Sequence, residues 1–161
     1  MFSMRSMLMA VALLPALVAS AQAQTNAPNR DHPKQAEFAQ AAAAPGGHTT
    51  ASGGDTIYFT YQKIFLTKEA VEVVKRQAAW LKAHPALKVR LECHTDDGYA
   101  LEESLEFGDT RCRAVETILI KNGINAGRIT ARSFGSQKPA VAVVAEPDRA
   151  KNRRVVSKIT D

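Results

Sequence analysis

The chain has 161 residues, of which 45% are hydrophobic and 23% are charged, and this composition is typical of one soluble domain with extensions. The formal net charge of +5 is a mild basic excess without a long run of lysine or arginine, so the sequence argues against a nucleic-acid partner. The two cysteines are an even number, which leaves no thiol over if they pair.

Residues 1–23 have the pattern of a secretory signal peptide. One early cation, Arg5, precedes an apolar run of about 12 residues at 7–18, and Ala21-Gln22-Ala23 supplies the small residues of a cleavage site. The run is too short to cross a hydrocarbon core of roughly 30 Å. We therefore expect cleavage after Ala23, export to the periplasm, and a mature chain without a transmembrane segment.

Residues 24–54 are expected to form a flexible leader. They contain one phenylalanine and no valine, isoleucine, leucine or methionine, so they cannot bury enough apolar surface to offset the entropy lost on ordering. Within this segment, KQAEFAQAAAA is expected to form no more than a transient helical turn or two.

From residue 55 onward, the hydrophobic pattern alternates between strand and helix periods. It predicts strands at 56–61, 87–95, 128–135 and 153–160, helices at 68–83 and 101–121, and a loop with a short turn at 138–151. Thr67 is the expected N-cap of the first helix. This order predicts an α+β fold for residues 55–161, a two-layer sandwich with both main helices on one face of a small mixed sheet.

The two cysteines lie on predicted inward faces. Cys93 belongs to the alternating apolar positions of the 87–95 strand, and Cys112 belongs to the inward stripe of the second helix. That stripe consists of Leu101, Leu105, Gly108, Cys112, Val115 and Leu119. Because an oxidising compartment favours pairing, we predict a Cys93–Cys112 disulfide, which would close a loop of about 20 residues and contribute roughly 3 kcal/mol.

The stretch LECHTDDG, residues 91–98, gathers a cysteine, a histidine and two aspartates. A zinc site needs three or four ligands, yet Cys93 and His94 are neighbours on a strand and point to opposite faces. The same geometry argues against a Cys–His nucleophile pair. We therefore expect no metal, no cofactor and no catalytic residue, and we interpret His94 as a structural or rim residue.

Asp96 at the end of the strand and Arg111 on the following helix can flank one pocket. A carboxylate that holds an ammonium, beside an arginine that holds a carboxylate, suits a zwitterionic ligand. A structural Asp–Arg salt bridge is the alternative, and the spacing alone leaves both open.

Four segments in order resemble the OmpA-like peptidoglycan-binding domain, the type found in OmpA, Pal and MotB. They are CHTDDG, LEFGDTRCRAV, NGINAGRITARSFGSQKP and NRRV, and the match spans residues 56 to about 159. The resemblance implies non-catalytic binding of the diaminopimelate of the peptidoglycan stem peptide. By position, Asp96 would hold its ammonium and Arg111 its carboxylate. Arg153 would add a second cationic donor.

The resemblance also implies supporting roles and shows departures. Asn152 and Leu105 would support the site. Ser104 stands where the family has asparagine, and Thr60 where it has aspartate, so these two positions would belong to the ligand site with altered chemistry. Cys93 and Cys112 replace a glycine and an alanine of the family pattern, and this paired change agrees with a disulfide.

The sequence therefore predicts an exported peptidoglycan-binding module that contributes to the organisation of the cell envelope. We expect it in the periplasm, associated with the cell wall or the outer membrane. The alternative is a degenerate module that acts as a periplasmic protein-interaction or assembly factor with weak or no peptidoglycan binding. An outer-membrane or periplasmic protein partner stays open in both cases.

Overall fold

The computed structural model describes residues 32–42 and 52–161. Its helices are α1 (Gln35–Ala42), α2 (Lys68–Ala83), α3 (Leu101–Lys121), the 3-10 turn η1 (Ala126–Arg128) and α4 (Glu146–Asn152). Its strands are β1 (Ser52–Gly53), β2 (Thr56–Tyr58), β3 (Lys88–His94), β4 (Ile129–Gly135) and β5 (Arg154–Thr160). The expected signal peptide lies outside the described residues.

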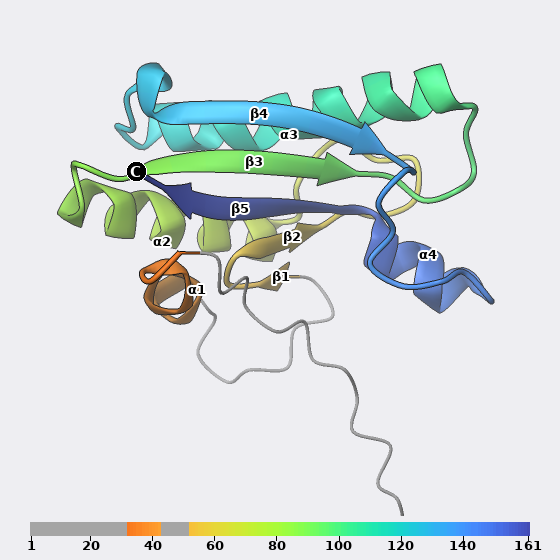
Figure 1. Cartoon of the computed structure of the whole chain (residues 1–161), viewed down its shortest axis with the longest axis horizontal. Helices are drawn as coiled ribbons and strands as arrows, with labels where there is room; N and C mark the ends of the chain where they lie inside the picture. The colour runs from red at the N-terminus through yellow and green to blue at the C-terminus, as the bar shows by residue number, and fades with distance from the viewer. Residues whose placement is uncertain (1–31, 43–51) are drawn as a thin grey trace, which may run out of the picture.

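The strands form one mixed sheet in the order β1-β2-β5-β3-β4, with α2 and α3 behind one face (Figure 1). β3 and β4 are parallel, as the crossover through α3 requires, whereas β3 pairs antiparallel with β5. The predicted α+β sandwich is confirmed. None of the described helices is both long and apolar enough to cross a membrane.

The boundaries of α2 follow local chemistry. Thr67 accepts a hydrogen bond from the Ala70 backbone N–H at 3.2 Å, which confirms the predicted N-cap. At the other end, the Arg128 guanidinium donates to the carbonyl oxygens of Leu81, His84 and Leu87. These bonds add a donor to carbonyls at and just beyond the end of α2, and they tie this end of the helix to the turn before β4.

The disulfide joins the centre of the sheet to α3. Cys93 on β3 and Cys112 on α3 are fully buried and bonded to each other, with their Cα atoms 5.8 Å apart, as predicted. The helix lies close to the sheet at this level. A Cβ added to Gly108, one turn before Cys112, would clash with Ser133 Oγ of β4.

The inward stripe of α3 begins later than predicted. Leu101 is 50% exposed, so its assignment to the core is wrong, and Leu105 is only partly buried. The buried positions in the first half of the helix are instead Ser104, Gly108 and Arg111. Leu101 is the first residue of α3, at the end of the helix that extends beyond the sheet (Figure 1).

Helix α1 differs from the expected flexible leader. Phe38 is fully buried, with its ring edge-on to Trp80 of α2 at 5.2 Å between centroids. Gln35, also buried, donates to Ser157 O and accepts from Ile159 N, so its side chain satisfies two main-chain groups of β5. One aromatic ring and one amide thus anchor a segment that contains no valine, isoleucine, leucine or methionine.

We predict that Phe38→Ala lowers the free energy of unfolding by about 3–5 kcal/mol, because it leaves a cavity against Trp80. Chemical denaturation measures the change. Gln40→Ala, at an exposed position of the same helix, is the control and is expected to change stability little. Equal, small effects of both substitutions would show that α1 does not pack on the domain.

We predict that the Cys93→Ala/Cys112→Ala variant is about 3 kcal/mol less stable than the oxidised protein, because the unfolded chain loses its cross-link. Thermal melts with and without a reductant measure this. The reductant is expected to lower the melting temperature of the wild type and to leave that of the variant unchanged.

Candidate functional site

A buried ion pair lies at the end of the sheet where β3 finishes and β5 begins. Asp96 follows β3 by two residues, and Arg153 immediately precedes β5, the antiparallel neighbour of β3. Asp96 Oδ2 accepts a hydrogen bond from Arg153 Nη1 at 2.8 Å, with both side chains 4% exposed or less. Antiparallel pairing therefore brings together two residues 57 positions apart.

Arg153 connects three segments of the site. Its Nη2 donates to Glu146 Oε1 of α4 at 2.7 Å, and its Nε donates to Phe59 O at 3.2 Å. Burial opposes the charge, but hydrogen bonds to Glu146 and Asp96 outweigh it and raise the pKa of Arg153 above its usual value. Arg153 is thus a fixed cation whose Nε, Nη1 and Nη2 atoms each donate a hydrogen bond within the protein.

Arg111 is the largest fully buried side chain among the described residues. Its Nε donates to Lys63 O at 3.1 Å, and its guanidinium lies 4.7 Å from the Phe107 ring centroid and 5.1 Å from that of Phe59. Burial lowers the pKa of Arg111 to about 10, although Tyr99 and Asp96 favour the charged form. Arg111 therefore remains a cation at neutral pH.

Several polar atoms around this pair are buried without a partner in the described structure. They are Asp96 Oδ1, Tyr99 OH, and Nη1 and Nη2 of Arg111. Burial and the nearby Asp96 charge raise the pKa of Tyr99, so its hydroxyl keeps its proton at neutral pH. Each unsatisfied group costs about 1–3 kcal/mol, so a ligand that supplies an ammonium and a carboxylate would relieve several penalties at once.

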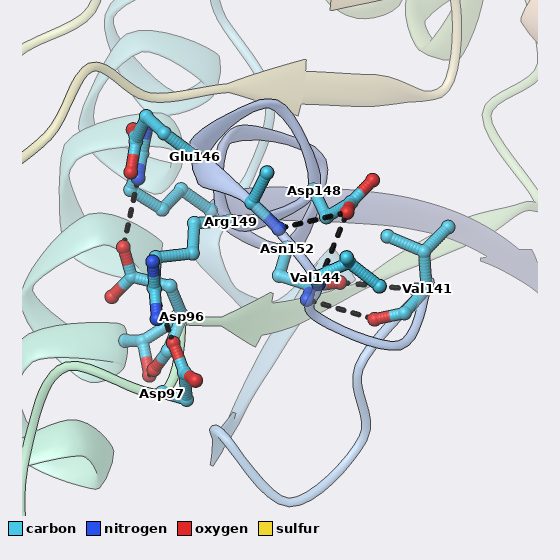
Figure 2. Close-up of polar contacts among 11 residues, drawn as sticks. Asp96, Asp97, Val141, Val144, Glu146, Asp148, Arg149 and Asn152 are labelled. Carbon is cyan, nitrogen blue, oxygen red and sulfur yellow. Dashed lines mark hydrogen bonds and ion pairs between the residues drawn. The ribbon is translucent and has the colours of Figure 1, made fainter.

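The α4 side of the site is fixed by polar contacts (Figure 2). Asn152 Oδ1 accepts from the N–H groups of Ala140 and Val141, and Asn152 Nδ2 donates to Val141 O. Arg149 of α4 donates to Asp97 Oδ1 at 2.8 Å, which links α4 to the residue after Asp96. The supporting role predicted for Asn152 thus has a geometric basis, because its amide holds the loop before α4.

The structure brings together three of the predicted site residues. Asp96 and Arg153 form a hydrogen-bonded ion pair, and Arg111 lies near enough for both charges to affect its pKa. Ser104 is buried, but its hydroxyl donates to Leu101 O within α3. Thr60 is exposed, and its carbonyl accepts from Lys63 N in a turn. Ligand roles for Ser104 and Thr60 stay predictions.

Sequence reasoning missed the aromatic surroundings of Arg111. Tyr99 stacks on Phe107 at 5.2 Å, and Phe107 and Phe59 face the guanidinium. The spacing of Phe107 and Arg111, one helical turn apart, could have indicated their contact. The Lys63 carbonyl and Glu146 had no such signal, because loop conformation places them.

His94 lies outside this cluster, on the opposite face of the sheet from Cys93. Its ring is 3% exposed and stacks on Phe134 at 5.5 Å, so the prediction of a structural residue fits the contacts. Within residues 32–42 and 52–161, no group of three histidines, cysteines or acidic residues could hold a metal ion.

A sequence model described as "OmpA family" matches residues 58–153, which include Asp96, Arg111 and Arg153. The chain belongs to the OmpA family. This membership confirms the resemblance seen in the sequence. The match begins in β2 and ends immediately before β5, so it covers both main helices and every residue of the buried cluster.

Curated relatives carry one recurring name. The peptidoglycan-associated lipoprotein of Haemophilus influenzae is 38% identical over 102 residues, 63% of this chain and 67% of the relative. That of Brucella melitensis is 28% identical over 151 residues, 92% of this chain and 89% of the relative.

Solved structures agree with the fold. The crystal structure of the peptidoglycan-associated lipoprotein from Burkholderia pseudomallei has a TM-score of 0.64 and 25% identity, covering 66% of this chain and 90% of that chain. The C-terminal domain of Helicobacter pylori MotB has a TM-score of 0.62 at 21% identity, covering 66% of this chain and 84% of that one. At this identity, the MotB likeness establishes the fold alone.

We predict that acid destabilises the protein through His94. Burial, with help from the nearby Arg154 and Lys138 charges, lowers the pKa of His94 from 6.5 to about 3. Below pH 6.5 the unfolded chain therefore binds a proton that the folded chain excludes. The free energy of unfolding should fall by up to about 1.4 kcal/mol per pH unit on this account.

Denaturation curves of wild type and His94→Phe between pH 7 and pH 5 test this prediction. The variant keeps a ring against Phe134 but has no proton to gain, so its stability should decline less steeply. Parallel declines of the two proteins would contradict it.

Proposed function

We propose that this protein binds peptidoglycan without catalysing a reaction, through the diaminopimelate of the stem peptide. The observation that carries the proposal is the buried set of unsatisfied groups of opposite character, Asp96 Oδ1 and the two Nη atoms of Arg111. The names of the relatives support the wall as the partner. The expected signal peptide and these relatives also favour a location in the periplasm, at the wall or the outer membrane.

The chemistry of the site suits the free end of diaminopimelate, which carries an ammonium and a carboxylate on one carbon. Asp96 Oδ1 would accept from the ammonium, while Asp96 Oδ2 keeps its bond to Arg153. The Nη atoms of Arg111 would donate to the carboxylate as a fork. Binding would thus replace buried, unsatisfied atoms by charge-assisted hydrogen bonds, without any nucleophile or metal.

Access to Arg111 requires movement. The side chain is fully buried, and its Nε is bonded to Lys63 O in the turn between β2 and α2. In our proposal this turn shifts when the ligand enters. Gln62 in the same turn has a φ of 53°, in the left-handed region, so the turn is held in a conformation that a non-glycine residue seldom adopts.

We predict that Asp96→Asn and Arg111→Gln each weaken sedimentation with diaminopimelate-type peptidoglycan by about tenfold or more, because each removes a charge-assisted hydrogen bond. Glu106→Gln and Arg113→Gln are matched controls. They make the same charge changes at exposed neighbouring positions and should bind like the wild type. Near-ultraviolet circular dichroism checks that all four variants are folded.

Lysine-type peptidoglycan provides a second arm of this experiment. Its lysine lacks the side-chain carboxylate, so Arg111 would stay unsatisfied and the wild type should bind more weakly. If the wild type fails to sediment with either wall, the proposal is overturned. That result would favour the alternative of a protein-interaction or assembly module, which the departures at Ser104 and Thr60 also suggest.

A further inference from the structure

Helices α2 and α3 leave one face of the sheet uncovered (Figure 1). This face carries a cluster of charged residues, which we call the basic face. Strand register and ring contacts place its members on one side of β3, β4 and β5. They are Lys88, Arg90, Glu92, Arg132, Lys138, Arg154 and Lys158. This surface is separate from the buried cluster at the end of the sheet.

The basic face holds the whole charge excess of the described chain. Residues 32–42 and 52–161 contain 19 lysines and arginines and 15 aspartates and glutamates. Six of those cations and one of those acids lie on the basic face, which leaves 13 cations and 14 acids elsewhere. The rest of the described chain is therefore nearly balanced, and the positive potential is concentrated on one side of the molecule.

Three of these cations, Arg132, Lys138 and Arg154, form no ion pair within the described structure. Glu92 accepts from both Arg90 and Lys158, at 3.2 and 3.1 Å. Arg132 and Lys138 instead lie over the Phe134 ring, at 4.9 and 4.1 Å from its centroid, and make no ion pair. Arg154 completes the cluster, with its Nη1 unsatisfied beside the Lys138 backbone.

We propose that the basic face docks on an anionic phospholipid surface. Its exposed cations project from three adjacent strands about 4.8 Å apart and from the loop after β4, so they spread over a broad, gently twisted face. Arg154 is only 9% exposed and adds its charge from a buried position. A lipid surface can meet all of them together, whereas a single glycan strand would contact one row. Each cation near an anionic membrane contributes about a fivefold gain in partitioning, less at higher salt.

The composition of the face fits lipid headgroups better than a protein partner. Protein interfaces are anchored by exposed aromatic or large apolar side chains. In the described structure such residues are Tyr61, Phe65, Leu101, Ile120 and Val144, and none of them lies on the basic face. Phe134 is only 8% exposed beneath its two cations, so docking is electrostatic and shallow.

The test compares sedimentation with phosphatidylcholine vesicles and with mixed phosphatidylcholine–phosphatidylglycerol vesicles at low and high salt. We expect the wild type to bind the anionic vesicles only, and less at high salt. Arg132→Gln/Lys138→Gln should weaken this binding by about tenfold or more, without loss of an ion pair in the fold. Lys82→Gln/Lys121→Gln, exposed on the helical layer, removes the same charge and should change it little.

Equal binding to both kinds of vesicle, or equal losses in the two double variants, would overturn the proposal. Dependence on Arg132 and Lys138 in sedimentation with peptidoglycan, but not with vesicles, would also overturn it and assign the face to the wall. Asp96→Asn should bind vesicles like the wild type, so failure of the peptidoglycan proposal leaves this result unaffected. All proteins share the same N-terminal segment, so any affinity of that segment cancels.

Discussion

The alternation of side chains along β3 is the constraint on which the rest of the structure depends. Its inward residues enter the core and fix α3 through the Cys93–Cys112 disulfide. Its outward residues, Lys88, Arg90, Glu92 and His94, belong to the open face of the sheet. The strand then ends two residues before Asp96. A register shift of one residue would exchange core and surface and move the carboxylate away from Arg153.

The buried cluster combines one satisfied and one unsatisfied cation. Arg153 has acidic partners on both edges of its guanidinium, so it maintains the structure around Asp96. Arg111 has aromatic neighbours and one carbonyl partner, and its Nη1 and Nη2 atoms have no hydrogen-bond partner in the described structure. Burial of an arginine in this way is unfavourable for folding. Such an arrangement is understandable where the missing partner is a ligand, and it makes Arg111 the more informative of the two cations.

Much of this architecture could be predicted from the sequence, because hydrophobic period and capping residues are local signals. The two main helices, the sheet and the disulfide followed from them. Leu101 was misplaced, since period alone does not show where a helix extends past the sheet. α1 was misjudged for a different reason: its burial depends on one ring, Phe38, and on Gln35, whose hydrogen bonds to β5 span more than 120 residues.

The candidate site was predictable only in part. Their positions at a strand end and on the following helix indicated Asp96 and Arg111, and the resemblance to the family added Arg153. Antiparallel pairing of β3 and β5 explains why Asp96 and Arg153 meet. The roles of Lys63 O and Glu146 arise from loop conformation, which leaves no periodic trace in the sequence. The basic face could not be predicted from the sequence, for a different reason. A mild overall charge says nothing about its distribution, and only the pairing of β3, β4 and β5 collects these cations on one side.

The two edges of the sheet have unequal consequences for self-association. β1, at one edge, has two residues and offers little backbone to another strand. β4, at the other edge, has seven, and its central residues are exposed. Exposed edge strands can pair with a second copy and seed aggregates, and a charged residue in their middle discourages this. Arg132 occupies that position, and its charge disfavours the pairing of β4 with a strand of another molecule.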